Sequence, residues 1–383
     1  MNTRHLTLLL AALIAICGCG PADTPSEQAE VPNLTIGHVG HDHQIALYIA
    51  ALEGDKLAEK YGVSLKMVKD REIYDLIEKG KTVARLKLVK VGGGSKMPAA
   101  MSRGEIDIGL GGVPAVAKFV DNGEKFKIIA PLQTDGDMLV MKVDSAISDW
   151  ASFVAAVKAP DAKPLKIGYK APVAVAKLIF ERAMKAEGVS YGYEGADNEQ
   201  VTLVNMRGGK NAIPLLSEGA IDGFVMNQPV VSISVHKKIG KVIAQLRDLP
   251  PAKKWHDHPC CCVCATQDTL DKHSDAVKAF LKLIHAGTKT IVSDSILAVD
   301  LASEWTKVAH EVEKQSVPSI RYISAPDDQW IAGMETWAEM MQDIKAFKGK
   351  YADMKPAAIV AELCDLSLCK TAAKELADTE PRE

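Results

Sequence analysis

Apolar runs of strand length alternate with amphipathic segments of helix length along most of this chain. An apolar run over residues 34–40 ends in a glycine turn and leads into a helical pattern over 44–61, which closes at Gly62. A run over 165–172 ends in the same way and leads into a helical pattern over 173–187. Strands that alternate with helices predict mainly parallel sheets with helices on both faces. We therefore predict an α/β fold.

The same order of elements occurs twice, which predicts two lobes of similar build. In residues 102–109 and again in 217–223, a helix ends at a glycine and a buried strand begins at Ile-Asp. A polar turn over 133–136 separates two apolar runs and predicts a crossing between the lobes. The predicted organisation is a first part of lobe 1 over residues 33–136, lobe 2 over 137–267, and a return to lobe 1 with C-terminal helices over 268–383.

The N-terminus has the pattern of a lipoprotein signal peptide over residues 1–19. Arg4 and His5 precede an apolar run that is too short to span a bilayer, and small residues surround the cysteines that follow. Cys19 is the predicted lipidation site, because bulky Ile16 directly precedes the other cysteine. The alternative is an ordinary cleaved secretory peptide. Residues 20–32 are rich in Pro, Ser and acidic residues, which predicts a flexible tether. We predict a periplasmic or other extracytoplasmic protein that a lipid anchors to a membrane.

The charge balance narrows the range of partners. The chain has 46 Lys and Arg against 49 Asp and Glu, so it lacks the basic field that nucleic-acid binders use. No Ser-His-Asp order, phosphate loop or dinucleotide fingerprint stands out. We therefore expect a monomer that binds no nucleic acid and is not an enzyme.

Three segments carry a resemblance to a known family: Met101 to Gly109, Gly219 to Gly223, and Cys260 to Phe280. With the export signal and the two lobes, they resemble the solute-binding proteins of ABC importers, in the family that serves nitrate, sulfonate, taurine and thiamine-pyrimidine transport (NMT1/THI5-like). The resemblance implies a two-lobed type II periplasmic binding protein fold, with a ligand cleft between lobes that close by a hinge. It also implies delivery of a small solute to an ABC permease and its ATPase.

In such a fold, ligands collect at the carboxyl ends of parallel strands, where helix N-termini offer unpaired N–H groups. Applied to this sequence, that rule selects turns which follow the predicted strands in both lobes. The candidate ligand-binding residues are His38, His41, Asp42, His43, Gly94, Ser95, Lys96 and Gly112 in the first lobe, and Tyr169, Lys170, Arg207, Asn227 and Gln228 in the second. The identity of the solute stays open.

The run Cys-Cys-Cys-Val-Cys over residues 260–264 allows three interpretations. In a regular strand, Cys260, Cys262 and Cys264 would share one face and Cys261 the other. The cysteines are then buried core residues, part of a disulfide, or ligands of a metal or metal complex. For the metal interpretation the candidate ligands are His256, His258, Cys260 and Cys262. No cofactor is predicted apart from this transition metal.

The cysteine run also resembles a Cys-Cys-Cys-Phe-Cys motif that is associated with iron in fungal thiamine-pyrimidine synthases. Those enzymes hold pyridoxal phosphate on a lysine that closely follows the Asp-x-Gly strand. Here the corresponding stretch, Gly109 to Ala115, has neither Lys nor His. The leading hypothesis is therefore a solute-binding lipoprotein of an ABC importer. A metal- or metal-complex-binding lipoprotein and a synthase-like enzyme are the alternatives.

Overall fold

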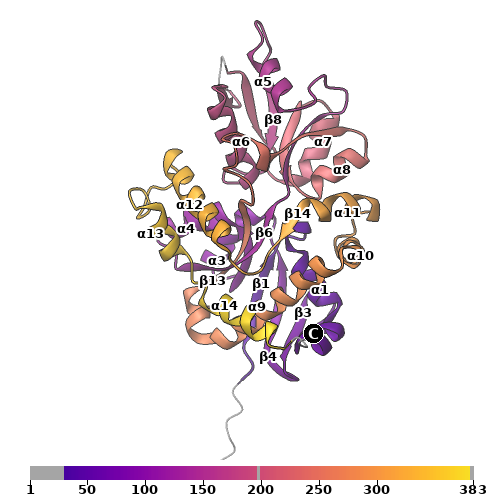
Figure 1. The fold of residues 1–383 in the computed structure, drawn as a ribbon, viewed down its shortest axis with the longest axis vertical. Helices are drawn as coiled ribbons and strands as arrows, with labels where there is room; N and C mark the ends of the chain where they lie inside the picture. The colour runs from indigo at the N-terminus through magenta and orange to yellow at the C-terminus, as the bar shows by residue number, and fades with distance from the viewer. Residues whose placement is uncertain (1–29, 196–198, 380–383) are drawn as a thin grey trace, which may run out of the picture. The chain divides into compact units, whose positions relative to one another are not determined.

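Two β-sheets form the framework of the computed structural model, which describes residues 30–195 and 199–379 (Figure 1). Both sheets belong to one compact unit that begins at Val31. The predicted signal peptide 1–19 with Cys19, and residues 20–29 of the predicted tether, lie outside the described residues. No helix in the described part of the chain is long and apolar enough to cross a bilayer.

The first sheet has eight strands and forms the first lobe. In spatial order its strands are β14 (Ile320–Tyr322), β6 (Phe126–Asp135), β13 (Pro259–Thr266), β5 (Ile108–Gly112), β1 (Asn33–His38), β4 (Lys81–Lys90), β3 (Ile73–Glu78) and β2 (Val63–Lys69). β1 is parallel to β4 and β5, whereas β13 runs antiparallel to both of its neighbours. The antiparallel hairpins that join β2, β3 and β4 were not predicted from the sequence.

The second sheet has six strands and forms the second lobe. Its spatial order is β12 (Gly240–Gln245), β7 (Asp137–Lys142), β11 (Gly223–Asn227), β8 (Leu165–Tyr169), β10 (Val201–Asn205) and β9 (Tyr191–Tyr193). β8 lies parallel to β10 and β11, and β7 is antiparallel to β11 and β12. Two α/β lobes confirm the predicted fold class.

Helices cover the sheets, and they divide between the lobes. The first lobe carries α1 (Ile45–Leu52), α2 (Gly54–Tyr61), α3 (Met97–Ser102), α4 (Val113–Asp121), α9 (Gln267–Ser293), α10 (Ser295–Thr306), α11 (His310–Ser316), α12 (Asp328–Asp343), α13 (Pro356–Leu363) and α14 (Ser367–Ala377). The second carries α5 (Trp150–Lys158), α6 (Val175–Ala186), α7 (Ala212–Ser217) and α8 (Val230–His236). α2 ends at Gly62, whose φ of 66° suits a residue without a Cβ. α9 begins at Thr266, whose side chain accepts a hydrogen bond from the Thr269 N–H.

The chain crosses between the sheets twice. It first passes from β6 to β7 through Gly136, and it returns between β12 and β13 over residues 246–258. β13 lies in the first sheet, although the predicted second lobe extends to residue 267, because its backbone pairs with β5 and β6. This strand is buried along nearly its whole length, so most of its cysteines are core residues of the first lobe.

Candidate functional site

The candidate site lies at one edge of the first sheet. β1 ends at His38 and β5 ends at Gly112, and both strands point to this edge. Because β13 is antiparallel to β5, its N-terminal residues lie where β5 ends. The crossing Asp135–Asp137 lies at the same edge, since Thr134 pairs with Pro259. Ligand sites of open α/β sheets form at such edges.

A β-bulge in β13 brings two cysteine side chains together there. In the pairing with β6, the register shifts between Pro259 and Cys261 and again between Cys261 and Cys262. The Sγ atoms of Cys260 and Cys261 and a ring nitrogen of His43 consequently lie within 4.8 Å of one another. The regular alternation expected from the sequence is therefore wrong at Cys260, because a bulge adds a residue and changes which face the side chains take. We call His43, Cys260 and Cys261 the dithiol site.

His43 is positioned by a short 3-10 helix, η1 (Asp42–Gln44), that follows β1. His41 caps this turn by accepting the His43 N–H on its Nδ1 at 3.2 Å. The Nδ1 of His43 lies 3.5 Å from Cys260 Sγ and 4.0 Å from Cys261 Sγ, and it also contacts the Gln133 amide. The His43 Nε2 is buried without a hydrogen-bond partner. This nitrogen faces Gly136, where an added Cβ would lie 2.8 Å from it, whereas the Nδ1 faces the two thiols.

The surroundings shift the pKa values of the two thiols in opposite directions. Burial raises the pKa of Cys260 well above its ordinary value. The hydrogen bond from Cys260 lowers the pKa of Cys261 to about 5; burial opposes this, and His43 and Lys170 assist it. The Cys260 Sγ lies 3.2 Å from Asp137 Oδ2, so its single S–H can donate either to this carboxylate or to Cys261. Cys261 is therefore the more acidic of the two thiols.

The second lobe faces this edge with Lys170 and Asn227. Lys170 follows β8, and its ammonium donates to Asn227 Oδ1 at the end of β11. Burial and then the charges of His43 and Lys170 lower the pKa of His41 well below its ordinary value. Gln228 connects the lobes, since its Nε2 donates to Ser319 Oγ at 3.0 Å and its N–H donates to the Gly136 carbonyl at 3.1 Å. Groups from both lobes thus meet at the crossings.

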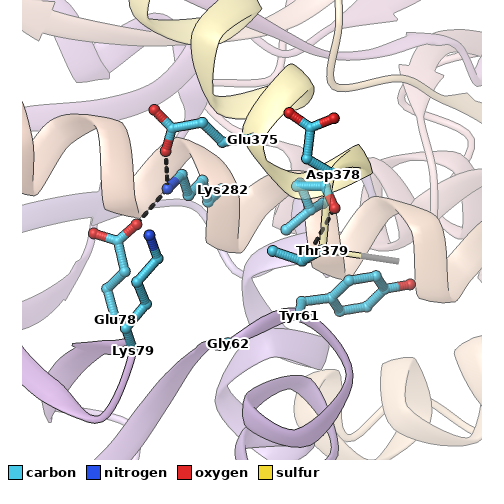
Figure 2. A pocket seen from close by; sticks show the side chains of 9 residues that line it. Tyr61, Gly62, Glu78, Lys79, Lys282, Glu375, Asp378 and Thr379 are labelled. Atoms are coloured by element: carbon cyan, nitrogen blue, oxygen red, sulfur yellow. Dashed lines mark hydrogen bonds and ion pairs between the residues drawn. The ribbon is translucent and has the colours of Figure 1, made fainter. Parts of the chain in front are cut away.

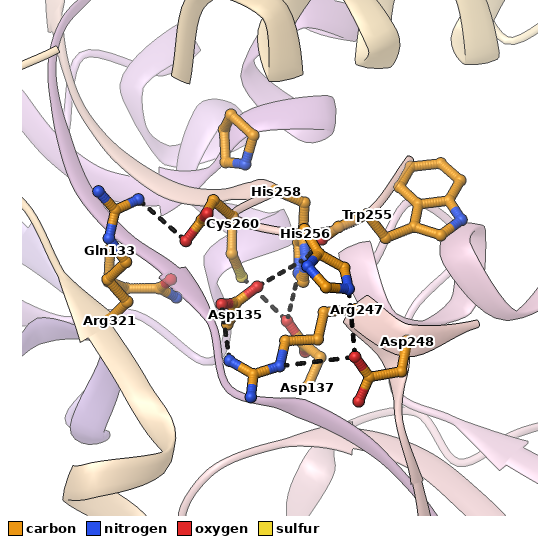
Figure 3. Close-up of polar contacts among 12 residues, drawn as sticks. Gln133, Asp135, Asp137, Arg247, Asp248, Trp255, His256, His258, Cys260 and Arg321 are labelled. Carbon is orange, nitrogen blue, oxygen red and sulfur yellow. Dashed lines mark hydrogen bonds and ion pairs between the residues drawn. The ribbon is translucent and has the colours of Figure 1, made fainter. Parts of the chain in front are cut away.

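An ion-pair network joins the two crossings beside the dithiol site (Figure 3). His258 Nδ1 lies 2.7 Å from the Trp255 carbonyl and 3.3 Å from Asp135 Oδ1, and its Nε2 lies 3.5 Å from Asp137 Oδ2. Burial disfavours the imidazolium, but the bonds to the two aspartates outweigh it and raise the pKa of His258 to about 9. Arg247 approaches Asp135 at 3.3 Å from the other side. His258 is therefore a charged partner of the aspartates.

The structure does not bring the four predicted metal ligands together. His258 binds the aspartates, and His256 is half exposed at 3.3 Å from Asp248. Cys262 points toward the Gly111 carbonyl, 3.6 Å away. Only Cys260 reaches the dithiol site, where Cys261 and His43 replace the expected partners.

The other predicted ligand-binding residues take varied positions. His38 points into the first lobe, where its Nδ1 lies 3.1 Å from the Tyr48 hydroxyl, and burial lowers its pKa to about 4. Asp42 is turned away from the site toward Ser316 and Glu313, and burial followed by the charge of Glu313 raises its pKa well above the usual range. Tyr169 is buried, with the Lys177 ammonium 5.4 Å from its ring centroid.

The glycine-rich turn after β4 lies beside the end of β5. A Cβ on Gly94 would approach the Gly112 N–H at 3.3 Å, so these two turns pack closely. Ser95 is half-buried and Lys96 is exposed. Arg207 is also exposed, and it lines a pocket of about 350 Å³ on the second lobe.

A further pocket of about 240 Å³ lies between the α2–β2 and β3–β4 turns, α9 and the C-terminal end of α14 (Figure 2). Lys282 projects toward it and is paired with Glu78 and Glu375. None of its lining residues belongs to the dithiol site. The ion pairs hold the C-terminal helix against the first lobe.

Sequence reasoning missed Cys261, Gln133 and Asp137. Gln133 and Asp137 flank the polar turn that predicted the crossing, but their side chains had no recognisable motif. Cys261 was assigned to the opposite face because a bulge leaves no signal in the residue types of one strand.

These features define a two-lobed α/β fold of the periplasmic binding protein type. Three solved structures share its fold. A ligand-binding component of an ABC-type import system from Staphylococcus aureus with zinc bound is 18% identical with a TM-score of 0.67, over 89% of this chain and 99% of that one. The periplasmic nitrate-binding protein NrtA from Synechocystis PCC 6803 is 16% identical with a TM-score of 0.66, over 92% of each chain. The aliphatic sulphonate binding protein SsuA from Escherichia coli is 13% identical with a TM-score of 0.61, over 87% of this chain and 92% of that one.

The chain belongs to the NMT1-like family, whose sequence profile matches residues 27–298. An uncharacterized protein from Methanocaldococcus jannaschii, MJ1180, is 36% identical over 138 residues, which are 36% of this chain and 92% of that protein. The predicted family is confirmed.

Proposed function

We propose that this protein is the solute-binding lipoprotein of an ABC importer, anchored through Cys19 outside the cytoplasm. It captures a small solute between the first lobe, which contains β13, and the second lobe, and delivers it to the permease and ATPase. Its family and its fold, which it shares with binding proteins of importers, support this role. We propose that it acts as a monomer, without catalysis and without a nucleic-acid partner.

One observation carries the proposal: polar groups of both lobes converge where the chain crosses between them. His41, His43 and the Cys260–Cys261 bulge come from the first lobe, and Lys170 acts on them from the second. A solute that touches both sets would favour the closed arrangement, because it binds that arrangement more tightly than an open one. Tyr169, Asn227 and Gln228 would form the second-lobe wall beside Lys170.

The chemistry of the dithiol site supports a second candidate, in which the solute is a metal ion or metal complex. Thiolate and imidazole are the ligands that Zn²⁺ and softer transition metals prefer. The His43 Nδ1 faces both thiols, and the neighbours of Cys261 lower its pKa. The related fold from Staphylococcus aureus was solved with zinc bound. A bare oxyanion is less favoured, because Asp135 and Asp137 already balance the nearby cations His258 and Arg247.

Native mass spectrometry of the purified full chain, followed by a thermal-shift screen, tests both candidates. The screen compares nitrate, an alkanesulfonate, taurine, a pyrimidine and Zn²⁺. A true solute raises the melting temperature by linkage and reduces the radius of gyration in solution scattering. Stabilisation by Zn²⁺ alone supports the metal candidate, and stabilisation by an organic solute or nitrate contradicts it. Stabilisation without any change in scattering contradicts capture between closing lobes.

The anchor has a test of its own. Cys19→Ser should release the protein from membranes and leave its melting temperature unchanged. Continued attachment of the variant to membranes would contradict lipidation at this residue.

A further inference from the structure

We propose that Cys260 and Cys261 form a reversible disulfide with each other, which switches the dithiol site between a binding and a non-binding form. The disulfide itself follows from the geometry of the bulge. Its consequence for binding rests on the proposed function.

The bulge removes the usual obstacle to a bond between adjacent cysteines. In a regular strand, neighbouring side chains point to opposite faces. Here both Sγ atoms lie on the side of His43, within 4.8 Å of each other. The register shifts on both sides of Cys261 show that the backbone already departs from regular pairing at this point. A bond between these thiols would therefore leave the pairing of Cys262 to Ala265 with β5 in place.

Such a bond would be easily reversed. Consecutive Cα atoms are about 3.8 Å apart, closer than the roughly 4.4–6.8 Å that relaxed disulfides prefer. Strained disulfides are more readily reduced and serve regulatory or catalytic roles more often than structural ones. The position at the meeting of the two lobes gives oxidants and reductants access when the lobes separate.

The oxidant is a low-molecular-mass or protein disulfide, and the reaction is thiol–disulfide exchange. The Cys261 thiolate attacks one sulfur of the oxidant, a Sγ–S bond forms, and the other sulfur leaves as a thiolate with the bonding electrons. Cys260 Sγ then attacks Cys261 Sγ and expels the second thiolate, which takes up the proton that Cys260 loses. One thiolate and one thiol are oxidised to one disulfide, and the oxidant is reduced to one thiolate and one thiol.

Oxidation changes what the site offers to a solute. Asp137 loses the thiol donor, and the negative charge of the Cys261 thiolate is lost. His43 remains as a single ligand. Loss of two of three ligands should weaken Zn²⁺ binding by well over tenfold, because even changes outside the ligand shell cost about 10–100-fold.

The test equilibrates the full-length protein in mixtures of reduced and oxidised glutathione and measures its intact mass. We expect the loss of two hydrogen atoms, with peptide mapping after alkylation showing Cys260 linked to Cys261. Cys260→Ser should accumulate a glutathione adduct on Cys261, because the resolving thiol is gone. Cys264→Ser is the matched control on the same strand and should oxidise like the wild type. Circular dichroism checks that each variant folds.

Three results would overturn the proposal: no loss of hydrogen at any glutathione ratio, a stable glutathione adduct on Cys261 of the wild type, or a disulfide mapped to Cys262 and Cys264. The mass measurement needs no solute, so it separates this inference from the proposed function. Equal Zn²⁺ affinity of reduced and oxidised protein, where the reduced form binds Zn²⁺, would contradict the switch even if the disulfide forms.

Discussion

The two halves of β13 contain the same residue type but differ in their surroundings. Cys262 and Cys264 lie in the C-terminal half, inside the first lobe, where a further register shift against β6 falls between Val263 and Cys264. The Cys264 thiol donates to the Gly109 carbonyl at 3.2 Å and touches Met101 Sδ at 3.4 Å. Cys260 and Cys261 lie in the bulged half, among His43, Asp137 and the second-lobe Lys170.

This difference shows that the position of a cysteine along a strand decides its chemistry. In the interior half, burial makes the thiol a small apolar side chain. At the sheet edge, the surroundings raise the pKa of Cys260 and lower the pKa of the adjacent Cys261. One sequence run therefore serves both the core and the candidate site.

The largest expected effect concerns the charged residues around the bulged half of β13. The pKa of His258 rises from 6.5 to about 9 on folding, which corresponds to about 3 kcal/mol. Because the folded pKa is raised, this stability is fully present below about pH 6.5 and is lost as the pH rises through 9. The free energy of unfolding, measured by denaturant titration between pH 6 and pH 8, below the range in which the buried cysteine thiols with raised pKa values contribute, should therefore fall with pH. In His258→Gln this fall should largely disappear, and an unchanged pH profile would contradict the ion-pair network.

The next effect tests how tightly the crossing packs against the dithiol site. Gly136 has a φ of 80°, and a Cβ there would lie 2.8 Å from both His43 Nε2 and Ile320 Cγ1. Gly136→Ala should lower the free energy of unfolding by about 1–3 kcal/mol, because backbone strain adds to the collision. Gly123→Ala is the matched control, with a φ of 102° and no atom near its added Cβ. Equal losses in both variants would show that strain alone acts.

The sequence was sufficient for the parts of the fold that depend on local patterns. Alternating apolar and amphipathic segments predicted the α/β lobes, and the polar turn 133–136 predicted the crossing that Gly136 makes. The hairpins of residues 63–90 were missed although their pairing is local: Glu78 pairs with Lys81 across the two-residue turn Lys79–Gly80. The alternation of buried and exposed residues along β4 is the pattern of a half-exposed strand, and the prediction did not use it.

Less of the candidate site than of the fold could be predicted from the sequence. His41, His43, Lys170 and Asn227 were selected because they follow strands, and the structure brings them to the crossings. His38 and Asp42 follow the same strand but turn into the first lobe, since Tyr48 and Ser316 offer partners that come from α1 and α11. The pairing of Cys260 with Cys261 depends on a bulge against β6, which is distant in the sequence.

A smaller effect concerns the interior cysteines. Cys264→Ser should lower the free energy of unfolding by about 1–3 kcal/mol, because a shorter, more polar hydroxyl replaces a thiol that fits the core. Cys261→Ser should change it by less than about 1 kcal/mol, since the edge already has polar neighbours. Denaturant titration of both variants under reducing conditions checks this order, and a larger loss for Cys261→Ser would reverse the comparison.

The most direct test of the account compares ligand-induced stabilisation in the same two variants. The melting temperature of wild type, Cys261→Ser and Cys264→Ser is measured with and without the compound that stabilises the wild type in the solute screen. The account predicts that Cys264→Ser keeps the full ligand-induced shift despite its lower starting melting temperature, whereas Cys261→Ser loses most of it. An undiminished shift in Cys261→Ser, or an equal loss in both variants, would contradict the claim that the bulged half of β13 holds the solute.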